Sequence, residues 1–210
     1  ILQSSTSADI YNKANQVLAT KTPADLLEDM KVEVVCTTDD PADHLEYHQQ
    51  IAKQNIFTKV YPTFRPDALL LIQSHTYQDY LKKMTACVGF PIENLDDLLK
   101  AIQSRVDYFD LHGCRLSDYG LEQIYTSDFT EEEADLVLKK RLTNQPVIKE
   151  EAALFASCML YNLCKMYHGK GWVQQFHLGA LRNNNSRLLE QIGTDSGCDS
   201  IGDFSHGATM

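Results

Sequence analysis

Hydrophobic residues recur along the chain in two alternating patterns, one typical of strands and one typical of helices. Short runs of β-branched and apolar residues predict strands over 31–37, 57–63, 114–118 and 172–178. Apolar positions three and four residues apart predict helices over 8–20, 23–30, 41–54, 77–85, 95–112, 131–142 and 147–166. Strands that alternate with helices are typical of βαβ units. We therefore expect an α/β fold with about four parallel strands, helices between them and a helical insertion.

Side chains that can cap a helix N-terminus stand just before five of these predicted helices. They are Thr22, Asp40, Thr76, Asn94 and Thr130. Such residues accept hydrogen bonds from the free N–H groups of the first helical turn. We expect the five helices to begin directly after them.

Polar and charged side chains stand at the carboxyl end of each predicted strand. Asp39 follows the first strand and Arg65 the second. Asp118 ends the third strand, His177 lies near the end of the fourth, and Arg182 follows shortly after. Parallel sheets and barrels bind their ligands at this end of the strands. The pattern predicts a ligand site built from these residues.

Three of these residues also have a structural interpretation, and the sequence leaves both open. Asp39 is either a loop residue or part of a substrate-binding site. Arg65 either binds a ligand carboxylate through two parallel hydrogen bonds or forms an ion pair with Asp67. His177 is either a hydrogen-bonded structural residue or a functional one.

The charge of the chain excludes some classes of partner. Its 210 residues include 19 Lys and Arg against 29 Asp and Glu, a formal net charge of −10. This balance disfavours a nucleic-acid binder and a protein of anionic membrane surfaces. No apolar run approaches the roughly 20 residues of a membrane-spanning helix, and residues 1–5 do not resemble a signal peptide. We expect a cytoplasmic protein whose six cysteines are reduced.

The common cofactor and nucleophile motifs are missing from the sequence. It contains no glycine-rich dinucleotide or P-loop motif, no G-x-S-x-G and no C-x-x-C. His44 and His48 have the spacing of a two-histidine zinc site, but the residue after His44 is not the glutamate of a metalloprotease. We interpret this pair as a solvated helix face and predict no metal site from the residues.

Five segments carry a resemblance to the uronate isomerase (glucuronate isomerase) family. They occur in the family's order and are spread over most of the chain: 37–41 (TTDDP), 64–67 (FRPD), 112–118 (HGCRLSD), 171–185 (GWVQQFHLGALRNNN) and 197–203 (GCDSIGD).

The resemblance implies a (β/α)8 barrel of the amidohydrolase superfamily. It implies the interconversion of D-glucuronate with D-fructuronate and of D-galacturonate with D-tagaturonate. Arg65, Asp118 and His177 match positions that the family uses in its active site. On this basis Arg65 would anchor the substrate carboxylate, His177 would contact the substrate oxygens or relay a proton, and Asp118 would orient His177 or a hydroxyl. Arg182 and Asn183 are weaker candidates for shaping the pocket.

The sequence also departs from the family pattern. Family members are more than twice as long, and a His-x-His pair and a later Asp bind a divalent, zinc-like metal in them. This chain has no His-x-His, so the usual metal ligands are absent, and it resembles the middle portion, roughly the second to fifth strands.

We therefore expect residues 1–210 to be one partial barrel domain, a fragment of a longer chain, and inactive alone. Its open sheet edges predict a homo-oligomer. The alternative is a non-catalytic sugar-acid-binding α/β module derived from the same barrel.

Overall fold

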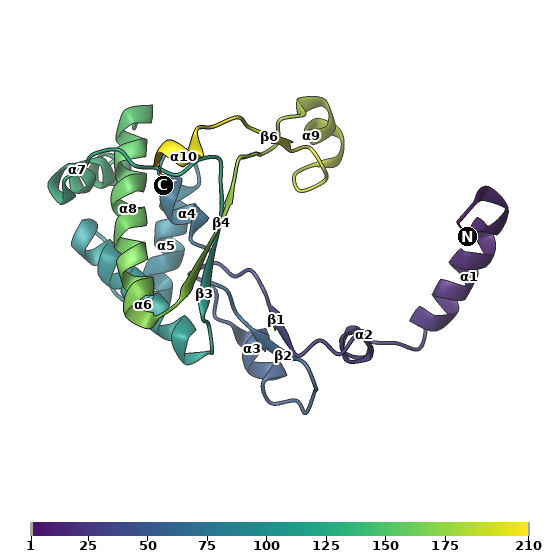
Figure 1. The fold of residues 1–210 in the computed structure, drawn as a ribbon. Helices are drawn as coiled ribbons and strands as arrows, with labels where there is room; N and C mark the ends of the chain where they lie inside the picture. Colours follow the sequence, from purple (N-terminus) through teal and green to yellow (C-terminus); the bar gives the residue numbers. More distant parts are fainter. Residues whose placement is uncertain (1, 210) are drawn as a thin grey trace. The chain divides into compact units, whose positions relative to one another are not determined.

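A computed structural model describes residues 2–209 of the chain, which divides into two compact units (Figure 1). The smaller unit comprises Ile1–Thr37 and Leu45–Tyr61, and the larger one Thr38–His44 and Pro62–Met210.

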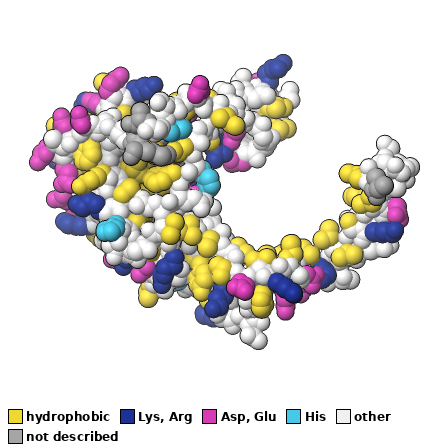
Figure 2. All heavy atoms as spheres, in the orientation of Figure 1, with side chains coloured by type: hydrophobic (Ala, Val, Ile, Leu, Met, Phe, Trp, Pro, Cys, Tyr) yellow, Lys and Arg dark blue, Asp and Glu magenta, His cyan; other side chains and the backbone are white. Residues whose placement is uncertain are grey.

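The smaller unit combines short helices with one pair of parallel strands. Its elements are η1 (Ser4–Thr6), α1 (Ser7–Leu18), α2 (Pro23–Asp29), β1 (Val34–Cys36), α3 (Glu46–Ile51) and β2 (Lys59–Tyr61). Val34 of β1 lies opposite Lys59 of β2. Hydrophobic side chains of α1 lie on the surface, among them Val17 and Leu18, each about half exposed (Figure 2).

The larger unit contains the longest helices and a second pair of parallel strands. Its helices are α4 (Asp67–Leu70), α5 (Tyr77–Val88), α6 (Leu95–Leu111), α7 (Glu131–Leu142), α8 (Lys149–Lys170), α9 (Ser186–Ile192) and α10 (His206–Thr209). Its strands are β3 (Leu116–Leu121), β4 (Val173–Leu178), β5 (Ala180–Leu181) and β6 (Ser200–Ile201). β3 pairs with β4 in parallel, and β5 pairs with β6 antiparallel.

Parallel pairing continues beyond β3 on the side away from β4. Phe64 forms a parallel bridge with Ser117 of β3 and another with Asp39. The predicted fold class, an α/β chain with parallel strand pairs, is confirmed by these pairings.

One face of the β3–β4 pair is apolar and packs against helices. Phe64 is fully buried, with its ring centroid 5.0 Å from that of Phe109 in α6 and 5.8 Å from that of Tyr167 in α8. Tyr119 of β3 stacks on Phe176 of β4 at 4.8 Å. Burial raises the pKa of the Tyr119 and Tyr167 hydroxyls above the usual range, so these tyrosines stay neutral. The side chains at the alternate positions of β3 and β4 point to the opposite face.

Three of the predicted helix caps are confirmed. Thr22, Asn94 and Thr130 each accept a hydrogen bond from a backbone N–H of the first turn. Thr76 precedes α5 as predicted, but its side chain makes no capping hydrogen bond. The prediction for Asp40 is wrong: its carboxylate accepts the Ala42 N–H at 2.8 Å in a turn, and α3 does not begin until Glu46. A local side-chain hydrogen bond has here replaced the start of a helix.

The third strand was placed too early by the sequence. Cys114 still bonds to Phe109 at the end of α6, so β3 starts at Leu116 and extends to Leu121. Asp118 therefore lies inside β3 rather than at its end. The short elements α4, α9, α10, β5 and β6 were not predicted.

No helix among the described residues is long and apolar enough to cross a membrane. All six cysteines are free.

Candidate active site

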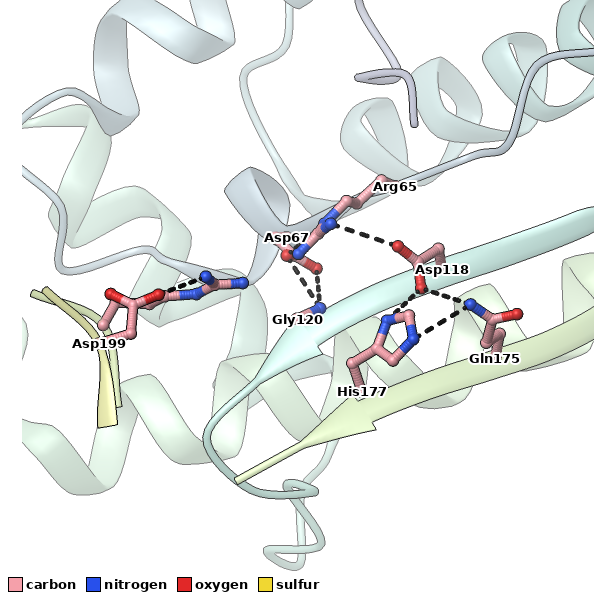
Figure 3. A network of polar contacts seen from close by, with 8 residues as sticks. Arg65, Asp67, Asp118, Gly120, Gln175, His177 and Asp199 are labelled. Atoms are coloured by element: carbon pink, nitrogen blue, oxygen red, sulfur yellow. Dashed lines mark hydrogen bonds and ion pairs between the residues drawn. The ribbon is translucent and has the colours of Figure 1, made fainter. Parts of the chain in front are cut away.

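A buried carboxylate lies at the centre of the polar face of β3 and β4. The side chain of Asp118 is 6% exposed and receives three hydrogen bonds (Figure 3). Oδ1 accepts from Nδ1 of His177 at 2.8 Å and from Nε2 of Gln175 at 3.3 Å. Oδ2 accepts from Nη1 of Arg65 at 3.3 Å. A buried carboxylate is costly unless it is paired, and these three donors supply that pairing.

The strand register explains why these side chains meet. Asp118 lies opposite Gln175, and Gly120 lies opposite His177. Alternate residues of a strand face the same side, so Asp118 and Gly120 share a face with Gln175 and His177. Figure 3 shows the four on facing positions of the two strands.

The contact with Asp118 also defines the state of the His177 ring. An ionised carboxylate only accepts hydrogen bonds, so Nδ1 of His177 is the donor and carries a proton. In the neutral ring Nε2 is then unprotonated and accepts a hydrogen bond from Nε2 of Gln175 at 3.3 Å. The His177 side chain is 61% exposed, so a ligand can reach the ring and replace Gln175 as the donor to Nε2. A histidine oriented in this way can accept a proton or a hydroxyl hydrogen bond.

Backbone pairing brings Arg65 to the same face. Phe64 accepts a hydrogen bond from the Asp118 N–H and donates one to Leu116, which fixes the residue before Arg65 against β3. The guanidinium donates from Nε to Asp67 at 2.9 Å as well as from Nη1 to Asp118. The ion pair with Asp67 that the sequence left open is therefore present. It does not exclude a ligand, because Nη2 donates to no residue in the described part of the chain.

Asp39 lies beside the site as a support for its backbone. Its carboxylate accepts the Thr63 N–H at 3.1 Å, and its backbone carbonyl accepts the Arg65 N–H at 2.9 Å. The loop that follows Asp39 is held by buried Arg105 of α6, which donates to the carbonyls of Pro41 and Asp43 at 2.7 Å each. Asp39 thus helps to position the backbone of Arg65.

Arg182 and Asn183 do not join the group around Asp118. Arg182 donates to Asp199 at 2.6 Å, and the Asn183 N–H donates to the other carboxylate oxygen at 2.8 Å. These two bonds, the backbone one first, lower the pKa of Asp199 from its usual value. In Figure 3 no dashed line links Asp199 to the residues around Asp118.

Sequence reasoning missed two residues of the site, Gln175 and Gly120. The two-residue spacing of Gln175 and His177 in a strand was a signal for a shared face. Nothing in the sequence revealed that Gly120 lies under the Arg65 side chain, because that follows from the pairing of three separate segments.

The glucuronate isomerase family model matches residues 1–210. This chain belongs to the glucuronate isomerase family. Among curated uronate isomerases, that of Opitutus terrae is 46% identical over 200 residues, and that of Flavobacterium johnsoniae is 41% identical over 206 residues. These matches cover 94% and 97% of this chain.

Solved structures of this family contain the same fold. A uronate isomerase of Thermotoga maritima superposes with a TM-score of 0.91 at 31% identity, covering 97% of this chain. A glucuronate isomerase of Caulobacter crescentus gives 0.90 at 26% identity over 100% of this chain. The chain spans less than half the length of these proteins, 45% and 44%, and 42% and 44% of the two curated relatives. The expected resemblance to part of a uronate isomerase is confirmed.

The divalent metal implied by the family does not fit this part of a glucuronate isomerase. Over residues 2–209, no group of three or more His, Cys, Asp and Glu side chains could hold a metal ion. At the site itself, the nearest candidate donors are already bonded to each other, since Nδ1 of His177 binds Asp118.

Proposed function

We propose that this chain is the segment of a uronate isomerase that binds the sugar acid and orients a histidine next to it. The reaction is the aldose–ketose isomerisation of D-glucuronate to D-fructuronate, and of D-galacturonate to D-tagaturonate, in carbohydrate catabolism in the cytoplasm. One observation carries the proposal: Asp118 contacts both Arg65 and His177. A carboxylate-binding group and a proton-accepting group are thus held by one buried anion.

Arg65 is the proposed anchor for the C6 carboxylate of the substrate. Its Nε and Nη1 groups are engaged by Asp67 and Asp118, which leaves Nη2 to donate to an anion. The Arg65 side chain is 26% exposed, so a ligand on the polar face can reach it. A charge-assisted hydrogen bond from a partly buried guanidinium binds a carboxylate strongly and directionally.

His177 is the proposed contact to the sugar oxygens. The reaction moves a proton from C2 to C1 and the carbonyl from C1 to C2, so protons must also leave and reach the two oxygens. With Nδ1 bound to Asp118, Nε2 can accept a hydroxyl proton and return it. Asp118 keeps the ring in that orientation. Three further residues are proposed to bind the substrate: Arg182, Asn183 and Asp39. Each of them also forms a hydrogen bond within the protein.

We further propose that residues 1–210 form a partial (β/α)8 barrel domain of a longer gene product. The chain alone should not turn over substrate, because its described residues offer no donor set for the divalent metal that the family resemblance implies.

Loss of the C2 proton of D-glucuronate in D2O, followed by NMR with a divalent metal present, tests the proposal. We expect the longer gene product to exchange this proton and the 210-residue chain not to. In the longer product, Arg65→Met should slow the exchange by about a hundredfold, since a misplaced substrate loses that order of rate. Arg115→Met is the matched control, because Arg115 is 65% exposed and pairs with Asp110 away from the site.

Two outcomes would contradict the proposal. Exchange by the 210-residue chain at the rate of the longer product would refute the need for further segments. Binding of D-glucuronate without exchange by either protein would favour the non-catalytic sugar-acid-binding module instead.

A further inference from the structure

We propose that Asp67 and Gly120 are positioning residues that hold the Arg65 guanidinium over β3, with Nη2 as the nitrogen that donates to no other described residue. The inference rests on the proposed function for the identity of the ligand, a sugar carboxylate. The positioning itself rests on the contacts within the larger unit and is tested separately.

Asp67 links Arg65 to the backbone of β3. Its Oδ2 accepts from Nε of Arg65 at 2.9 Å. The same carboxylate accepts the Gly120 N–H, at 3.0 Å through Oδ2 and 3.2 Å through Oδ1. A side chain held by a strand N–H has little freedom, so the Nε edge of the guanidinium is fixed in direction as well as in distance.

Gly120 provides the space in which the guanidinium lies. A Cβ atom at this position would stand 2.0 Å from Nη2 of Arg65 and 3.2 Å from its Cζ. The backbone of Gly120 does not have a positive φ angle, so an alanine there causes no backbone strain. The conflict is with the end of a long side chain, which can move. Gly120→Ala should therefore displace the guanidinium while the strand stays folded.

The contacts of the Arg65 guanidinium with Asp67, Gly120 and Asp118 determine which of its nitrogens can donate to a ligand. Nε is bound to Asp67 and Nη1 to Asp118, and both carboxylates lie on the same guanidinium. Two anions on one cation lower its attraction for a third, so orientation rather than net charge must supply the selectivity for a carboxylate. Displacing Nη2 should then weaken carboxylate binding even though no charge has changed.

The first experiment measures the position of Arg65 directly, by NMR of its Nε–H group in the 210-residue chain. Loss of the signal in Arg65→Lys assigns it. We expect slow exchange of this proton with water in the wild type, and clearly faster exchange with a changed shift in Gly120→Ala and Asp67→Asn. Gly169→Ala is the matched control, because nothing lies within 4 Å of a Cβ at that glycine.

The second experiment titrates the same proteins with D-glucuronate and, as a neutral probe, D-glucose. We expect Gly120→Ala to weaken glucuronate binding by about tenfold or more, the effect of losing one hydrogen bond to a charged group. The thermal midpoint and any glucose binding should stay unchanged, and Gly169→Ala should bind as the wild type does.

An unchanged Arg65 Nε–H signal in Gly120→Ala and Asp67→Asn would overturn the positioning proposal, whatever the sugar does. A changed signal with full glucuronate affinity would overturn the link between position and binding. If the signal changes as expected but the wild type binds no glucuronate, the positioning stands and the proposed function fails.

Discussion

At the scale of single residues, the site depends on the contacts of one buried carboxylate. Asp118 receives hydrogen bonds from two alternate positions of β4, Gln175 and His177, and from Arg65. Removing it would leave Arg65 with one carboxylate and His177 with no acceptor for Nδ1. A substitution of Asp118 should therefore change the hydrogen bonds of Arg65 and the tautomer of His177 more than it changes the stability of the protein.

We predict that Asp118→Ala reduces the share of His177 that carries its proton on Nδ1. Long-range 1H–15N NMR at about pH 8, above the usual pKa of a histidine, reports the tautomer. Asp118→Asn should keep much of the Nδ1–H form, because its amide oxygen still accepts. Asp199→Ala is the control, since it removes a carboxylate that binds Arg182 and Asn183 and has no bond to His177 in the described part of the chain. An unchanged tautomer in Asp118→Ala would contradict the prediction.

At the scale of elements, the helix starts show that a capping residue is effective only when the local backbone lets its side chain turn back. Thr130 accepts the Glu133 N–H at 3.2 Å, and Glu133 returns a bond to the Thr130 N–H at 2.9 Å. Thr76 stands at the start of α5 in αR geometry, and its hydroxyl contacts Ser74 instead. The two threonines occupy the same N-cap position, but the backbone is extended at Thr130 and αR at Thr76, and only Thr130 forms the capping bonds.

We predict that Thr130→Ala lowers the free energy of unfolding by about 1 kcal/mol, the usual effect of losing an N-cap. Thr76→Ala should change it by less than about 0.5 kcal/mol, as an exposed residue without a capping bond does. Urea denaturation of the two variants beside the wild type measures both values. Equal losses in the two variants would contradict the prediction, because the capping bonds of Thr130 would then add nothing beyond the contribution of Thr76.

At the scale of the whole molecule, open sheet edges and exposed apolar residues favour self-association. Within residues 2–209, β4 pairs with β3 alone, so its other edge offers unpaired backbone groups. Val173 at the start of β4 is 68% exposed. An exposed strand edge pairs readily with another chain. Acidic and basic side chains are intermixed on the face drawn in Figure 2.

We predict that the 210-residue chain forms dimers or larger assemblies through β4. Sedimentation velocity at several protein concentrations should show association that Val173→Lys weakens, because a charge on an edge strand opposes pairing. Leu136→Lys is the control: it places the same charge on α7, at a residue 62% exposed and remote from a sheet edge. A monomer at every concentration would contradict the prediction, and equal effects of both variants would exclude β4 as the interface.

The sequence by itself determined the class of the fold and most of its elements. Runs of β-branched and apolar residues located β1 to β4, and apolar residues at helical spacing located the long helices. It also indicated Arg65, Asp118 and His177 as site residues, since charged side chains beside apolar strands have a small number of physical explanations.

Tertiary structure alone decided how those residues meet. The register of β3 against β4 placed Asp118 opposite Gln175, and the bridge through Phe64 brought Arg65 across β3. A shift of one residue would have turned each side chain to the other face, and local sequence does not encode the register of strands more than fifty residues apart. Arg182 and Asn183 instead bind Asp199, next to the antiparallel pair of β5 and β6.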